Sequence, residues 1–180
     1  MGCGGNGDRV LRHNALRDAI FSAAQSAALA PRREVPSLIP NSQSRPADVY
    51  LPNWKRGCPA ALDVTVISTM QQATIQGAAT TKGHALLVGE ARKLAAHSDA
   101  CREVGVSFVP VAFETFGGPS ATAVSTIAYL GRLLGQRLGI PPAESTRHLF
   151  QRCAISIWKG NAAMWSRRLP TQAPSIDGVC

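Results

Sequence analysis

The stretch "RPADVYLPNWKRGCPAALDVTVI" (Arg45–Ile67) holds two short strand-like pieces, VYL and LDVTVI, joined by a segment rich in turn residues. Apolar and β-branched runs bounded by Pro, Asn and Gly favour strands, and "PNWKRGCP" favours a turn. We therefore expect an antiparallel pair over residues 48–51 and 60–67. Asp48 and Asp63 lie in or beside these strands, a setting that disfavours aspartate.

The segments on either side of this hairpin are predicted to be mainly helical. Apolar residues at helical spacing, breaks at Pro and Gly, and one apolar β-branched run mark the remaining elements. The prolines and serines of residues 31–47 indicate a loop. The predicted elements are a helix over Val10 to Ala30, a long helix or two over Gln71 to Ala100 with a joint near Gly83, a buried strand over 106–118, helices over 120–139 and 144–169, and a loose tail.

This order of elements is that of an α/β or α+β protein, with helices packed on a small mixed sheet. The chain has 180 residues, 45% of them hydrophobic. A chain of this size buries roughly 70% of its unfolded surface in one compact domain. We therefore expect one globular domain.

The charge of the chain points to a polyanionic partner. Nineteen Lys and Arg face eleven Asp and Glu, which gives a net charge of +8. Such an excess is typical of proteins that bind nucleic acid, and an anionic membrane surface is the second candidate. No apolar run approaches the roughly 20 residues of a membrane span, and the first residues lack the apolar segment of a signal peptide.

Cysteine usage favours a reducing compartment. The five cysteines are odd in number and widely scattered, which argues against a disulfide framework. No CxxC pair occurs, so zinc is not predicted. We expect a soluble intracellular protein, nuclear or cytoplasmic, that is neither secreted nor membrane-spanning.

The two aspartates suggest a metal site. A tight hairpin would place Asp48 and Asp63 side by side, where their charges repel unless a hard cation such as Mg²⁺ lies between them. Glu90, Lys93 and His97 share one face of the long predicted helix. Carboxylates and a lysine beside a basic surface are what metal-dependent phosphodiester hydrolysis needs.

Five blocks in order resemble a known family. They are "RHNALRD" (Arg12–Asp18), "RPAD" followed after fourteen residues by Asp63, "EARK" (Glu90–Lys93), "CREVGVSFVPVAFETFGG" (Cys101–Gly118) and "FQRCAISIWKGNA" (Phe150–Ala162). Together they resemble the restriction-like endonuclease domain of the PD-(D/E)XK superfamily, as found at the C-terminus of non-LTR retrotransposon polyproteins that carry a reverse transcriptase. The resemblance covers residues 12–168. It implies that residues 1–11 are a Gly-rich remnant of a zinc knuckle. Residues 169–180 are expected to be a flexible tail.

The resemblance implies a restriction-endonuclease-like core, Mg²⁺ or Mn²⁺ at the site, and DNA strand cleavage. It implies Asp48 and Asp63 as metal ligands, Glu34 as a further acidic ligand and Lys93 as the catalytic lysine. Glu90 and His97 are candidate accessory groups because they share the helix face of Lys93. The superfamily places its lysine two residues after the second acid, where this chain has Thr65. The reverse transcriptase is absent from the 180 residues.

Six residues are predicted to contact DNA or RNA because they are basic or aromatic and lie near the hairpin or at the end of the last helix. They are Arg45, Trp54, Lys55, Arg56, Arg167 and Arg168. Trp158 and Trp165 are expected to pack a helix instead.

Each assignment has a structural alternative. Asp48 can be a turn or cap residue, Glu34 a solvated loop carboxylate, and Lys93 an exposed helical lysine paired with Glu90. His97 and His148 can be packed or surface histidines. At the level of function, the alternatives to a nuclease are a catalytically inactive nucleic-acid-binding remnant of that domain and a non-enzymatic basic interaction module.

Overall fold

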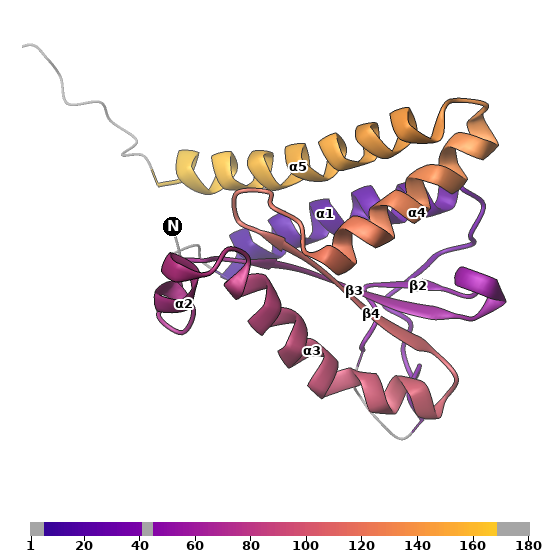
Figure 1. Cartoon of the computed structure of the whole chain (residues 1–180), viewed down its shortest axis with the longest axis horizontal. Helices are drawn as coiled ribbons and strands as arrows, with labels where there is room; N and C mark the ends of the chain where they lie inside the picture. The colour runs from indigo at the N-terminus through magenta and orange to yellow at the C-terminus, as the bar shows by residue number, and fades with distance from the viewer. Residues whose placement is uncertain (1–5, 41–44, 169–180) are drawn as a thin grey trace, which may run out of the picture.

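A computed structural model describes residues 6–40 and 45–168. It contains a four-stranded mixed sheet in the order β1-β2-β3-β4. Helices α1 and α4 lie on one face of the sheet with α5 packed on them, and α3 covers the other face (Figure 1). The predicted α/β layout, with helices flanking a small mixed sheet, is confirmed.

The predicted hairpin is present at the centre of the sheet. Strand β2 (Val49–Leu51) pairs antiparallel with β3 (Ala60–Ile67), with Val49 opposite Leu62. The connecting segment contains a short 3-10 turn, Lys55–Gly57. A two-residue strand, β1 (Arg32–Arg33), extends the sheet beyond β2 within the stretch predicted to be a loop.

The long helical segment divides where the sequence predicts. Helix α2 (Ile75–Thr80) and helix α3 (His84–Glu103) are separated at Gly83, whose φ of 77° is in the left-handed region that glycine adopts at low cost. Helix α3 then crosses over the sheet and leads into β4 (Ser107–Glu114), which runs parallel to β3 over its whole length. Parallel neighbours require such a crossover.

The other three described helices lie on the same side of the sheet. Helix α1 spans Asn6–Ser26, α4 spans Ala121–Leu138 and α5 spans Pro142–Ser166. Ser120 caps α4 by accepting a hydrogen bond from the Ala123 N–H, and Gly139 ends it. Because α1 begins at Asn6, the second half of the predicted N-terminal remnant belongs to this helix. Residues 1–5 and the predicted tail lie outside the described residues.

Alternation along β3 sends successive side chains to opposite layers. Leu62 and Val64 are buried in the main core under α1, α4 and α5. Ala61 and Ile67 lie in smaller clusters on the α3 side. Asp63 therefore faces α3.

Among the helices of the described residues, none has the length and apolar character needed to cross a membrane.

Candidate functional site

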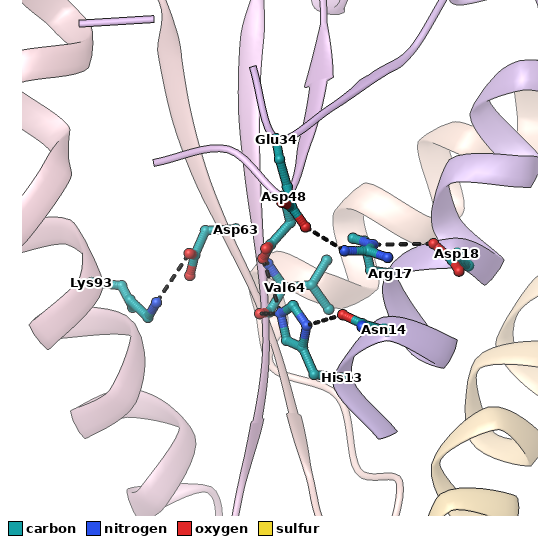
Figure 2. A network of polar contacts seen from close by, with 9 residues as sticks. All are labelled: His13, Asn14, Arg17, Asp18, Glu34, Asp48, Asp63, Val64 and Lys93. Carbon is teal, nitrogen blue, oxygen red and sulfur yellow. Dashed lines mark hydrogen bonds and ion pairs between the residues drawn. The ribbon is translucent and has the colours of Figure 1, made fainter. Parts of the chain in front are cut away.

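Asp48 lies at the point where the antiparallel pairing ends. Strand β2 pairs only with Ala60 to Leu62, so the main-chain groups of Val64 face an edge without a strand partner. The Val64 N–H donates to Asp48 Oδ2 at 2.7 Å. His13 Nε2, from α1, lies 2.9 Å from the Val64 carbonyl oxygen and 3.2 Å from Asp48 Oδ2 (Figure 2). Asp48 and His13 thus supply hydrogen-bond partners for the Val64 N–H and carbonyl, which no neighbouring strand of the described residues pairs.

The position of His13 determines its protonation. Both atoms near Nε2 are acceptors, so Nε2 carries the proton. The hydrogen bond to Asp48 raises the pKa of His13 above its ordinary value, although partial burial opposes this shift. His13 Nδ1 lies 3.3 Å from Asn14 Oδ1. When the ring is protonated, it forms a hydrogen-bonded ion pair with the Asp48 carboxylate.

Asp63 occupies a different environment in the middle of β3. The residue is 6% exposed. Lys93 Nζ, from α3, donates to Asp63 Oδ1 at 3.0 Å, whereas Asp63 Oδ2 is buried and has no hydrogen-bond partner among the described residues (Figure 2). Burial raises the pKa of Asp63, and the positive charge of Lys93 only partly offsets this rise. An ionised carboxylate with one unsatisfied buried oxygen is an energetically costly group.

The hairpin brings the two aspartates together, but they point toward different helices. Asp48 is one step beyond the Val49–Leu62 pair, and its N–H donates to the Leu62 carbonyl at 3.0 Å. Its negative charge contributes to the raised pKa of Asp63. In Figure 2 the Asp48 carboxylate lies beside Val64 and the His13 ring, and the Asp63 carboxylate points toward Lys93 on α3. The two aspartates are thus neighbours on the hairpin, but their side chains have separate partners: Asp48 contacts His13, and Asp63 contacts Lys93.

Glu34 forms ion pairs instead of joining the two aspartates. Arg17 Nη1 donates to Glu34 Oε1 at 2.6 Å, and Arg45 Nη1 lies 3.8 Å from Glu34 Oε2. The described residues contain no group of three or more His, Cys, Asp or Glu side chains arranged to hold a metal ion. The predicted role of Glu34 as a third metal ligand therefore stays a prediction.

The two accessory residues on α3 contact other parts of the fold. Glu90 Oε1 accepts a hydrogen bond of 2.6 Å from the Ser120 hydroxyl at the start of α4. The His97 ring lies 5.4 Å from the Phe108 ring, and its charge acts to lower the pKa of Asp63. Of the three residues predicted to share this helix face, Lys93 is the one that hydrogen-bonds a site carboxylate.

The exposure of the three tryptophans differs from the expectation. Trp54 is 5% exposed, because its ring packs edge-to-face against Tyr129 with centroids 4.6 Å apart. Little of the ring is therefore open to a base, which does not favour stacking, and the prediction that Trp54 contacts nucleic acid stays a prediction. Trp158 and Trp165, which were expected to pack, are 51% and 58% exposed.

The six predicted nucleic-acid contacts also differ in their charge partners. Arg45 pairs with Glu34, while Arg167 and Arg168 both pair with Asp8. Lys55 and Arg56 are exposed on the hairpin turn and form no ion pair with a carboxylate of the described residues. Within the described part of the chain, the unpaired cations of this set are thus on the turn.

His13 is the site residue that the sequence patterns did not single out. It lies in the "RHNALRD" block, and the only local signal was its position four residues before Arg17, which puts both side chains on one face of α1. Comparison of the chain with known protein families gives no match, and comparison with the curated proteins gives none either. The function is therefore inferred from the geometry of the site.

Proposed function

We propose that the protein is a metal-dependent endonuclease that hydrolyses phosphodiester bonds of DNA. The observation that carries this proposal is the Asp63 carboxylate, which is buried and has one oxygen without a partner among the described residues. A hard divalent cation prefers such oxygen ligands and would compensate the buried negative charge. Asp48, one step beyond the paired residues of the same hairpin, would be the second carboxylate ligand.

The surrounding residues suit this chemistry. When bound, Mg²⁺ or Mn²⁺ would neutralise negative charge on the phosphate and lower the pKa of the attacking water. Lys93 places a positive charge at Asp63, where it can stabilise charge that develops on a phosphate. His13 and the Val64 N–H fix the orientation of Asp48.

The order of elements and the overall charge support the same proposal. Helix α1, strands β1 to β3, helix α3 and strand β4 form a helix-flanked mixed four-stranded sheet, which is the core implied by the resemblance to the PD-(D/E)XK superfamily. Asp48 and Asp63 lie on its central hairpin, and Lys93 on the crossover helix takes the place of a lysine at Thr65. The net charge of +8 favours a polyanionic substrate.

The experiment is nicking of supercoiled plasmid with Mg²⁺, comparing the wild type with Asp63→Asn. The substitution keeps the side-chain size but removes the charge needed to hold a cation, so we expect a loss of at least about 100-fold. Glu103→Gln, at an exposed position on α3, is the matched control and should leave the rate unchanged. Mg²⁺-dependent nicking that is equal in the wild type and Asp63→Asn, or absent from both, would overturn the proposal.

A second candidate is a protein of this fold that binds nucleic acid without cutting it. The observation in its favour is that both carboxylates already have cationic partners, since Asp48 contacts His13 and Asp63 contacts Lys93. A protein of this kind would retain DNA at low salt in EDTA and show no nicking with any divalent cation.

A further inference from the structure

The hairpin turn and the helices α4 and α5 carry several basic residues that have no acidic partner among the described residues. Residues 119–166, which include α4 and α5, contain five basic residues and one acidic residue, Glu144. The basic residues are Arg132, Arg137, Arg147, Arg152 and Lys159. None of them, nor Lys55 and Arg56 on the hairpin turn, pairs with a carboxylate of the described residues. Their positive charges are therefore available to an external anion.

A groove separates the hairpin turn from α4. Its volume is about 440 Å³, and we call it the turn-α4 groove. It is lined by Lys55, Arg56, Ser125, Ala128, Tyr129 and Arg132. The groove thus combines three cations with one aromatic ring.

The aromatic ring of this groove is held in place. Lys55 Nζ lies 5.3 Å and Arg132 Cζ lies 5.0 Å from the centroid of the Tyr129 ring. Trp54, which is buried, supports the same ring from within the core. Cation–π contacts and close packing keep Lys55 and Arg132 near a defined position, so less side-chain entropy is lost when they bind a phosphate.

The basic surface continues beyond this groove. A second groove, of about 630 Å³, shares Ala128 and Arg132 with the first and extends to Arg147 and Phe150 on α5. The hairpin turn and the junction of α4 with α5 lie at the same end of the molecule (Figure 1). A polyanion chain can therefore follow cations from the turn across α4 to α5.

We propose that the turn-α4 groove, continued to Arg147, binds the phosphodiester backbone of DNA. Spaced cations around a partly buried aromatic ring are typical of surfaces that follow a nucleic-acid backbone. An anionic membrane is less suited, because binding to a membrane surface uses an apolar helix face inserted beside the basic residues, whereas here the cations surround a recessed groove. The choice of DNA rests on the proposed function, while the capacity of the groove to bind phosphate does not.

The test is the binding of a short fluorescein-labelled DNA duplex, followed by anisotropy in EDTA over a range of KCl concentrations. Lys55→Gln/Arg132→Gln removes two groove cations, and Lys82→Gln/Arg92→Gln removes two exposed cations elsewhere. We expect the groove pair to weaken binding about tenfold and to make the slope of log affinity against log salt shallower by about 2. The control pair should change affinity by less than about twofold.

Three results would overturn the proposal. They are equal losses in the two double variants, no loss in the groove pair, and loss of binding to phosphatidylserine vesicles with DNA binding intact. If the groove pair does not fold, as judged by circular dichroism, Arg132→Gln and Arg92→Gln repeat the comparison as single variants. Because the assay needs no divalent cation, a failure of the nuclease proposal in the plasmid assay leaves the result of this test unaffected.

Discussion

Asp48 and Asp63 are two carboxylates on one hairpin with opposite surroundings. Asp48 Oδ2 accepts from the Val64 N–H and contacts His13, and its side chain is 19% exposed. Asp63 is more deeply buried, with one oxygen on Lys93 and the other without a partner in the described part of the chain. Asp48 thus satisfies a main-chain N–H of the sheet, whereas Asp63 keeps one buried oxygen without a hydrogen-bond partner among the described residues.

The difference follows from where each residue lies in the sheet. Strand β3 continues beyond β2, so Val64 needs partners at the open edge, and Asp48 is the first residue before β2 that can supply one. Asp63 projects from the face of the sheet toward α3, where Lys93 is the donor that reaches it. A buried main-chain group is nearly always hydrogen-bonded. The Asp48 carboxylate therefore serves as the acceptor for the Val64 N–H.

The largest expected effect on stability is that of Asp48→Ala. The substitution leaves the Val64 N–H without its acceptor and removes the partner of His13, so we expect a loss of about 3 kcal/mol in the free energy of unfolding. Urea denaturation in EDTA measures it. Asp99→Ala is the control, because Asp99 is 78% exposed and should cost less than about 0.5 kcal/mol. Equal costs for the two variants would show that Asp48 has no structural task.

Lys93→Met is expected to have an intermediate effect. It removes the donor that hydrogen-bonds the Asp63 carboxylate and leaves a buried negative charge, at a cost of about 1–2 kcal/mol at pH 7. Lys93 lowers the pKa of Asp63, so its loss raises that pKa further. The protonated acid carries no charge, so the cost of Lys93→Met should shrink as the pH falls.

The double variant Lys93→Met/Asp63→Asn sharpens this prediction. Without a charge at residue 63, the loss of Lys93 should cost little, and a double-mutant cycle at pH 7 measures the difference. Additive effects of the two substitutions would mean that Asp63 and Lys93 do not interact energetically, which would also weaken the case for Asp63 as a charged ligand.

The elements that carry the site could be predicted from local patterns. The two apolar runs with a turn between them define the hairpin, and Gly83 divides the following helices. Strand β1 could not be predicted, because Arg32 and Arg33 have no apolar pattern and pair through the main chain. Local patterns are informative where the signal lies within a few residues of the element.

The partners of the site residues could not be predicted for the same reason. His13 reaches Asp48 across 35 positions, and Trp54 is buried by Tyr129, a residue of another layer. Arg167 meets Asp8 across 159 positions. Such contacts depend on how helices pack on the sheet, which the spacing of residues along one element does not determine.

The smallest expected effect is a pH dependence that originates at His13. Its pKa in the folded protein is raised above 6.5, first by the hydrogen bond to Asp48. The stability that His13 contributes is therefore fully present below pH 6.5 and is lost as the pH rises through the folded-state pKa. His13→Gln keeps a donor but does not titrate, so the difference in unfolding free energy between wild type and variant should decrease over this range. Urea denaturation in EDTA from about pH 5.5 to about pH 8.5 measures it. A difference that stays constant with pH would mean that the charge of His13 does not contribute to its contact with Asp48. Of the two aspartates, only Asp63 would then be stabilised by a cationic partner, Lys93.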